Sequence, residues 1–346
     1  MMDFDMYWNP YKLLPYQRNF MFVNSTRKDG KTYGTQYMVI DKFLKKGQQF
    51  VAIYRTDKEI KEGEFEASFQ KVSFEQFPQY HFTFKSNQMW LTELDENEKT
   101  KWIDIMGYAL PLSQTVKKKK MSFPRVHWAY MDEYMLEPED THQYVGGWKE
   151  PDKLLNLYHT IDAEEDRVKI FLLGNNTSFY NPYHLHPAFR IPWTQPGTIW
   201  KSDNVLFQHY IPSQQLAEKK SKSKFLNMIK DTEYGSYALQ GVYIGDSDEF
   251  IAKRPQKSQF VFTIKLDNAN YGIWGCDASV FVSDKTIVTS PLVFAFTKSD
   301  LSEETIYRYK QNKLIKWLLA KMLHCRVFYE TQEIKARVKP ELEKLI

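Results

Sequence analysis

The sequence has few cysteines and no long apolar run, and both absences narrow the class of protein. Only Cys276 and Cys325 occur in 346 residues, and their spacing fits no metal-ligand pattern. Two reduced thiols are therefore expected. No apolar stretch approaches the length of a membrane span, and no signal peptide opens the chain. These features predict a soluble intracellular protein with no membrane partner.

The excess of positive charge is also small. The chain carries 47 Lys and Arg against 43 Asp and Glu, a net charge of +4. This excess does not by itself indicate nucleic-acid binding, so any such prediction depends on local clusters. A hydrophobic content of 42%, with 24 Phe and 22 Tyr, indicates a folded chain. The length favours two domains.

A phosphate-binding loop is the strongest motif in the chain. A short apolar run from Phe20 to Val23 predicts a buried strand, and a polar loop with Gly-Lys-Thr follows it before a helix from Thr32 to Lys46. The backbone N–H groups of such a loop face phosphates, and Gly30 permits their close approach. Ser25 stands where the usual pattern has its first glycine. The residues predicted to bind ATP here are Ser25, Thr26, Arg27, Lys28, Asp29, Gly30, Lys31 and Thr32.

A second element supports the first. The mostly apolar run Val126–Met131 ends in two acids, Asp132 and Glu133, which is the form of a Walker B strand. Lys31 is expected to reach the β- and γ-phosphates, and Thr32 and Asp132 to hold Mg²⁺. Glu133 would orient and deprotonate the attacking water. Both motifs, in this order, predict an ATPase with ATP and Mg²⁺ as its ligands.

Other residues of the predicted ATPase domain have two interpretations each. In the aromatic segment from Tyr7 to Arg18, Gln17 would read the adenine edge, or the whole segment packs on the sheet. Asn175, at the end of the next apolar run, would sense the γ-phosphate or cap a turn. Arg167 would act as an arginine finger on a neighbouring subunit, or pair with nearby acids. Arg55 would touch phosphate or a neighbour, or lie on the surface.

Four consecutive lysines precede the Walker B run. They are Lys117, Lys118, Lys119 and Lys120. Like charges repel each other, so this stretch predicts an exposed loop. The alternatives are a solvated loop and a loop that contacts DNA phosphates without reading sequence. Its position close to the ATPase motifs favours DNA contact.

The composition changes near residue 225. We predict an ATPase domain over residues 1–200, a basic linker over residues 201–225 and a C-terminal domain over residues 226–346. Within the linker, Ser213 to Lys224 would form a basic helix or a hinge. A helix capped by Asp300, with Glu303 at the capping-box position, is expected late in the chain. The strands of the C-terminal domain are predicted at Gln240–Ile244, Gln259–Leu266, Gly272–Cys276, Val280–Val282, Thr286–Thr289 and Leu292–Phe296. Its loop acids, Asp267, Asp277 and Asp284, form no convincing metal cluster.

Taken together, these motifs resemble the phi-twenty-nine-like phage DNA-packaging (encapsidation) ATPases. The resemblance spans most of the chain. It lies in the P-loop with its arginine and in Asp132-Glu133, and also in stretches that are not general ATPase motifs. These stretches are Tyr7–Lys12, Pro111–Ser113, Leu154–Leu157, Asn181–Tyr183, Asp231–Gly235 and Ile244–Ser247.

The resemblance implies an α/β fold: a P-loop NTPase domain of the additional-strand (ASCE) type, RecA/FtsK/HerA-like, and an α+β, vestigial ribonuclease-H-like C-terminal domain. It implies a homopentameric ring on the viral prohead in the host cytoplasm, which pumps double-stranded DNA through the portal, with prohead RNA as a candidate partner. Arg27 matches the family's P-loop arginine and is expected to act in catalysis. The family has several arginines in the segment that corresponds to Asp162–Arg167, and of these only Arg167 is present in this sequence.

An ATP-driven DNA translocase is therefore the predicted function. Two alternatives remain open. The first is a packaging terminase with an active C-terminal nuclease, which needs a carboxylate cluster that binds metal ions. The second is a P-loop ATPase that controls assembly and is not a motor.

Overall fold

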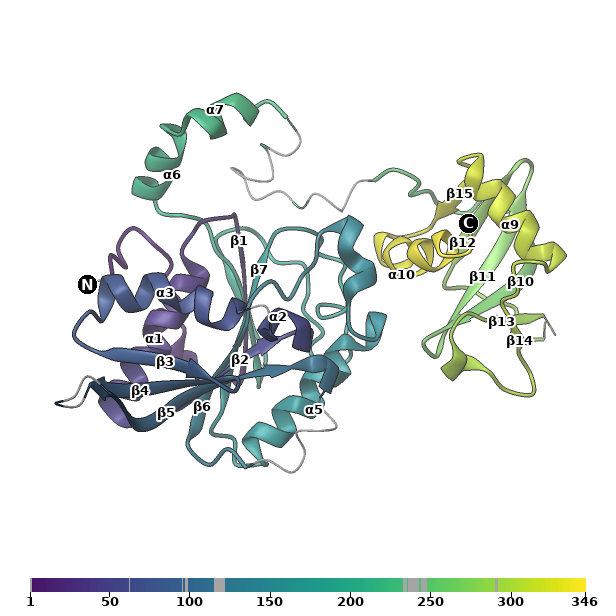
Figure 1. Ribbon diagram of the computed structural model, residues 1–346. Coiled ribbons are helices and arrows are strands. Elements are labelled where there is room, and N and C mark those ends of the chain that lie inside the picture. The colour runs from purple at the N-terminus through teal and green to yellow at the C-terminus, as the bar shows by residue number, and fades with distance from the viewer. Residues whose placement is uncertain are drawn as a thin grey trace. The chain divides into compact units, whose positions relative to one another are not determined.

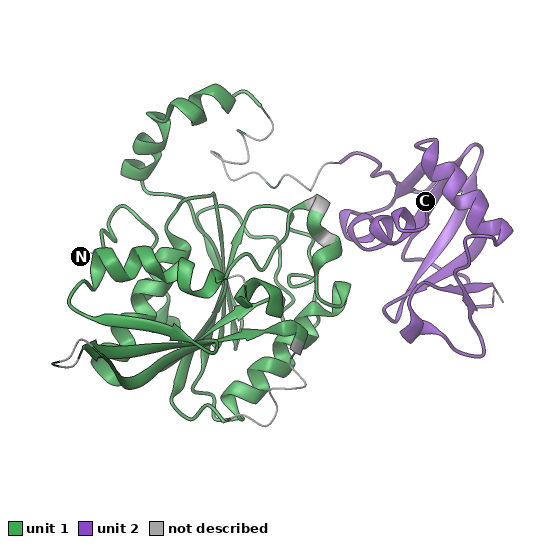
Figure 2. Ribbon diagram, viewed as in Figure 1, with its two compact units in different colours: residues 1–245 green, residues 246–346 purple. Residues whose placement is uncertain are grey.

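Two compact units, Met1–Gly245 and Asp246–Ile346, make up the chain (Figure 2). The computed structural model describes residues 2–346 except residues 62, 95, 97–98, 115–121, 233–234, 236–242, 244–247 and 290–291. No helix among the described residues is long and apolar enough to cross a membrane.

A nine-stranded sheet forms the centre of the first unit, in the order β3-β4-β5-β2-β6-β7-β1-β9-β8 (Figure 1). The strands from β5 to β9 in this order run parallel, and antiparallel pairs extend both edges. The strands are β1 (Phe20–Ser25), β2 (Gln49–Tyr54), β3 (His81–Lys85), β4 (Gln88–Leu94), β5 (Thr100–Pro111), β6 (Val126–Met131), β7 (Lys169–Asn175), β8 (Ile199–Lys201) and β9 (Val205–His209).

The position of β7 decides the fold class. It lies between β1, which leads into the P-loop, and β6, which leads into Asp132. This extra strand between the two motif strands defines the additional-strand class, so the predicted α/β fold is confirmed.

Helices cover both faces of this sheet. Because successive side chains of a strand point to opposite faces, Met21 and Val23 join the core under α1 and α3, and Phe20 and Phe22 join the core under α5. The helices of this unit are α1 (Lys31–Lys46), α2 (Asp57–Lys61), α3 (Glu64–Gln76), α5 (Glu150–Asp162), α6 (Gln214–Ser221) and α7 (Lys224–Ile229). The helix predicted to end at Lys46 does end there, and Gly47, with φ 65°, is its C-cap.

Two expectations for the first unit need correction. Short alternating runs between Phe74 and Ile105 predict a β-rich insertion, but this stretch extends the central sheet, because β5 pairs with β2 and carries β4 and β3 outward. Phe74 itself lies in α3. The unit also continues past the predicted boundary at residue 200, because β9 pairs with β1 and completes the sheet.

The second unit is built on a six-stranded mixed sheet in the order β14-β13-β10-β11-β12-β15. Its core side chains come from these strands and from two helices. The strands are β10 (Gln259–Leu266), β11 (Ala269–Cys276), β12 (Ser279–Ser283), β13 (Val293–Ala295), β14 (Ile306–Tyr307) and β15 (Val327–Tyr329), and the helices are α9 (Lys313–Leu323) and α10 (Gln332–Glu343). The antiparallel β10-β11-β12 with parallel β13 and β14 matches the expected ribonuclease-H-like α+β sheet.

Two local predictions in this unit are wrong. Thr286–Thr289 is not a strand. Asp300 does not cap a helix: its carboxylate accepts the backbone N–H groups of Asp267 and Asn268, and α9 begins later with Asn312 as its N-cap. The strand predicted at Gln240–Ile244 lies almost wholly outside the described residues.

His184 is buried in the first unit, against Phe179 and Phe207, and its Nε2 lies 2.7 Å from the hydroxyl of Tyr134. Burial lowers the pKa of His184 from 6.5 to about 3. The unfolded chain therefore binds more protons than the folded chain between these two values, and folding stability falls as the pH drops through this window.

The first prediction follows from this buried imidazole. From pH 6.5 to pH 5, the free energy of unfolding of the wild type should fall more steeply than that of His184→Gln, by up to about 1.4 kcal/mol per pH unit. Urea unfolding at several pH values measures both slopes. Equal slopes would show that His184 does not titrate with folding.

Candidate active site

The P-loop connects the carboxyl end of β1 to the first turn of α1. Gly30, directly before α1, has φ 86°, a conformation that L side chains rarely adopt. A Cβ added there would also lie 3.0 Å from the Cβ of Tyr7. Glycine is therefore required at this position by both backbone conformation and space.

The departure at Ser25 has a structural consequence. Ser25 is fully buried, and its hydroxyl accepts a hydrogen bond from Lys31 Nζ at 2.7 Å. Lys31 also donates to the carbonyl of Thr26 and to Asn175 Oδ1, at 3.1 and 3.3 Å. Burial lowers the pKa of Lys31 to about 8. The serine thus supplies an acceptor for the lysine that is predicted to bind phosphate.

Asp29 lies inside the loop and is 1% exposed. Its carboxylate accepts the Thr26 hydroxyl at 2.8 and 3.0 Å, which braces the turn of the loop. Its neighbours Arg27 and Lys28 are exposed, and Arg27 forms an ion pair with Glu137 at 2.7 Å. Arg27 and Lys28 thus lie at the surface beside the predicted phosphate site.

Two oxygen-bearing side chains, one in the first turn of α1 and one directly after β6, lie in contact at the end of the P-loop. The Thr32 hydroxyl donates to Asp132 Oδ2 at 2.6 Å, and burial raises the pKa of Asp132. Mg²⁺ prefers such oxygen ligands and commonly takes one or two from protein and others from substrate phosphates and water. These residues fit the ion. Among the described residues, no three His, Cys, Asp or Glu side chains cluster as a metal site.

Glu133 follows Asp132 in a left-handed conformation, with φ 51°. Its own N–H donates to Asp132 Oδ1 at 3.1 Å. The protein atoms around its carboxylate, and then the charge of Asp132, raise the pKa of Glu133, although the residue remains exposed. A carboxylate whose pKa is shifted towards neutrality is suited to accept a proton from water.

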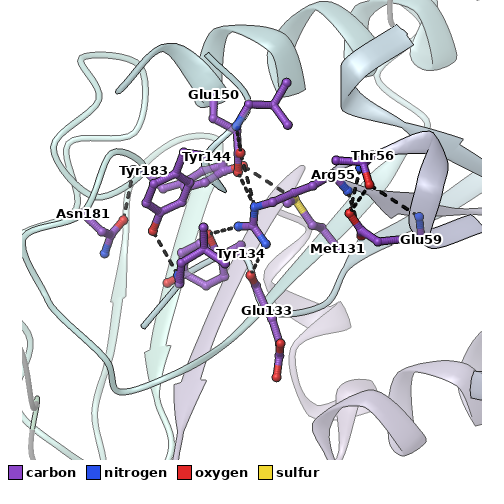
Figure 3. Close-up of polar contacts among 12 residues, drawn as sticks. Arg55, Thr56, Glu59, Met131, Glu133, Tyr134, Tyr144, Glu150, Asn181 and Tyr183 are labelled. Atoms are coloured by element: carbon purple, nitrogen blue, oxygen red, sulfur yellow. Dashed lines mark hydrogen bonds and ion pairs between the residues drawn. The ribbon is translucent and has the colours of Figure 1, made fainter. Parts of the chain in front are cut away.

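Arg55 supports the backbone of the turn at Glu133 and Tyr134 (Figure 3). Its guanidinium donates to the carbonyls of Glu133 and Tyr134, both at 2.8 Å, and pairs with the buried Glu150 at 3.2 Å. Tyr183 donates to Glu150 at 2.7 Å. Figure 3 shows the Glu133 side chain directed away from the guanidinium. Arg55 is 8% exposed, so the expectation of a surface or phosphate-contacting arginine is wrong.

Two predicted site residues lie away from this edge, and Gln17 is the first. It precedes the amino end of β1, whereas the P-loop follows the carboxyl end, about 17 Å further along a strand of this length. Gln17 therefore does not line the site. Tyr7, from the same segment, does lie against the loop.

Arg167 is the second, because it precedes the amino end of β7. Its guanidinium donates to the carbonyls of Val126, Phe123 and Ile161 and to Glu165, at 2.6 to 3.0 Å. These bonds lie within one chain, and a role towards a neighbouring subunit stays a prediction.

The four lysines that are predicted to contact DNA fall outside the part of the chain that the structure describes. These are Lys117, Lys118, Lys119 and Lys120, all within residues 115–121. The exposed loop expected there, and its contact with DNA, therefore stay predictions. The strand that follows them, β6, begins at Val126 and leads into Asp132 as expected.

One contact was missed by the sequence analysis. Lys220 of α6 forms an ion pair with Asp29 of the P-loop. The two residues are 191 positions apart, so no local pattern signals the contact.

The sheet order and the groups at its carboxyl edge define a P-loop NTPase of the additional-strand class. Within this class the chain belongs to the podovirus DNA encapsidation protein (Gp16) family, whose profile matches residues 2–344. The chain is therefore a phage DNA-packaging protein, and the resemblance drawn from its motifs is confirmed.

Individual relatives match over nearly the whole chain. The chain is 29% identical to the DNA packaging protein of Bacillus phage PZA and 28% identical to that of Bacillus phage phi29, over 96% of both partners in each comparison. A solved structure of the bacteriophage Phi-29 viral genome packaging motor assembly matches with a TM-score of 0.71 at 28% identity, covering 99% of this chain and 100% of the other.

The second prediction concerns the arginine behind Glu133. Arg55→Ala should lower the free energy of unfolding by about 3–5 kcal/mol, because it leaves Glu150 buried and uncompensated. The matched control is Arg125→Ala, whose ion pair with Asp104 is half exposed to solvent and should cost about 0–1 kcal/mol. Denaturant unfolding of both variants measures the difference, and equal losses would contradict the role of the buried pair.

Proposed function

We propose that this protein hydrolyses ATP and uses the energy to move double-stranded DNA into a preformed prohead. The observation that carries the proposal is the 2.6 Å contact between Thr32 and Asp132, which joins the segment that holds Lys31 to the segment that holds Glu133. Membership of the DNA encapsidation family supports the same conclusion.

Each residue of the proposed site has a separate role in ATP hydrolysis. The P-loop N–H groups and Lys31 bind the phosphates, and Thr32 and Asp132 would hold Mg²⁺, which neutralises charge on the phosphate oxygens. Glu133 takes a proton from the attacking water. Arg27 stabilises charge that develops on the transferred phosphoryl group. Asn175, already in contact with Lys31, reports the presence of the γ-phosphate.

A ring of identical subunits would complete the site. A likeness over the full chain to a packaging motor assembly supports a ring of this kind. We keep Arg167 as the candidate arginine finger, which must then give up its hydrogen bonds to main-chain carbonyls. The proposed ring is a homopentamer that acts at the portal of the prohead in the host cytoplasm, with prohead RNA as a further candidate partner.

The lysine stretch is the proposed DNA contact. Four adjacent ammonium groups bind phosphates without reading bases, which suits a motor that must package any sequence. Lys117, Lys118, Lys119 and Lys120 stand in the sequence shortly before β6, the strand that leads into the catalytic acids.

The third prediction tests the ATPase. Double-stranded DNA should accelerate ATP turnover by the wild type, and Glu133→Gln should lower kcat by about 10²–10⁴-fold while ATP still binds. Glu66→Gln, an exposed acid on α3, serves as the control and should leave the rate unchanged. Full turnover by Glu133→Gln would show that another residue activates the water. An ATPase rate that does not change when DNA is added would favour the ATPase that controls assembly. Cleavage of plasmid DNA would favour the terminase with an active nuclease.

The fourth prediction tests the DNA contact. Replacing all four residues of Lys117–Lys120 by Ala should weaken DNA binding and flatten its salt dependence, by about 0.9 in the log–log slope for each phosphate that is no longer neutralised. Binding titrations over a range of salt concentrations measure this slope. Replacing Lys45 and Lys46, at the far end of α1, should leave it unchanged. An unaltered slope in the Lys117–Lys120 variant would place the DNA contact elsewhere.

A further inference from the structure

The linker helix α6 forms polar contacts with the P-loop, although the two segments lie far apart in the sequence. Lys220, in its last turn, donates to the Thr26 hydroxyl and to the Arg27 carbonyl, both at 2.8 Å, and pairs with the Asp29 carboxylate. The Lys220 side chain is 11% exposed and that of Asp29 is fully buried. A cation from the linker thus lies against the loop that is proposed to bind phosphate.

Two further contacts fix the same helix. Ser213, the N-cap of α6, donates from its hydroxyl to the carbonyl of Met6 at 2.7 Å. Lys219 donates to the hydroxyl of Tyr7 at 2.9 Å and lies over its ring. Tyr7 in turn lies against Gly30. The helix therefore holds the P-loop directly and also through the segment that braces it.

The charge of Asp29 explains why these contacts matter for nucleotide binding. A buried carboxylate inside an anion-binding loop repels phosphate, and this repulsion is strong where little water screens it. The other buried cation of the loop, Lys31, donates to Ser25, Thr26 and Asn175. The ion-pair partner of Asp29 is Lys220, so the close compensation of the buried Asp29 charge depends on the position of α6.

We propose that Lys220 is a positioning residue of the nucleotide site, which neutralises Asp29 and makes the P-loop able to bind ATP only while α6 is docked. The proposal deepens the proposed function and rests on it. Because coupling between two equilibria is reciprocal, bound nucleotide also holds α6 against the loop.

A four-protein charge cycle tests the proposal. The affinity for ATP with Mg²⁺ is measured for the wild type, Lys220→Met, Asp29→Asn and the double variant. Lys220→Met should bind about tenfold more weakly or worse, because it leaves a buried charge unpaired. The double variant should recover to within about threefold of the wild type, since the repelling charge is gone and the Asn oxygen still accepts from Thr26. Lys220→Arg should bind like the wild type.

The matched control is Lys222→Met, an exposed lysine directly after α6, which should leave the affinity unchanged. Wild-type affinity in Lys220→Met would overturn the proposal. So would a double variant as weak as Lys220→Met, because Lys220 would then act through packing and not through its charge. If the wild type itself binds no ATP, the proposed function fails first, and the two failures are thereby distinguished.

A measurement on the wild type alone covers the case in which Lys220→Met does not fold. Amide hydrogen exchange of α6 is followed with and without ATP and Mg²⁺. Nucleotide should slow exchange of the α6 amides, because it favours the docked helix. Unchanged exchange in α6, at nucleotide concentrations that saturate the site, would overturn the coupling.

Discussion

The parallel pairing of β1, β7 and β6 is the constraint on which the site depends. Parallel neighbours end at the same edge of a sheet, so the residues that follow these strands meet although they lie far apart in sequence. The pairing of Ser25 with Asn175 brings the γ-phosphate sensor candidate to the P-loop lysine, and β6 carries Asp132 to Thr32. Both faces of the central strands are covered by apolar side chains, which fixes the register of these strands.

Several charged side chains are buried at this edge of the sheet. Lys31, Asp29, Arg55 and Glu150 are all nearly inaccessible to solvent, and each one has partners that compensate its charge or satisfy its hydrogen bonds. Arg55, directly after β2, pairs with Glu150 of α5 and donates to the carbonyls of Glu133 and Tyr134. A buried pair of this kind adds little net stability, but it tolerates few other geometries. The backbone of Glu133, the proposed general base, is thus held by a pair of residues from other elements.

Local signals account for the parts that could be predicted from the sequence. The strand–loop–helix pattern around Gly30, the apolar run before Asp132 and the glycine stop after α1 each depend on near neighbours, and all three appear as expected. Two errors share a cause. Arg55 and Asp300 were assigned from their place in a pattern, but their environments are made by distant segments: α5 for Arg55 and the β10–β11 turn for Asp300. The error at Gln17 has another cause, because the direction of β1 places the P-loop at the opposite end of the strand.

The sequence by itself determined the class of the fold, its motif residues and its family, because the class and the motifs follow from short spacings and the family from short stretches that can be compared directly. Tertiary structure alone decided which charges are paired. It joined Lys220 to Asp29 across 191 residues and Arg55 to Glu150 across 95. The physical reason is that a buried charge must find an opposite charge or a set of hydrogen bonds wherever the folded chain supplies one, and no spacing along the chain records that partner.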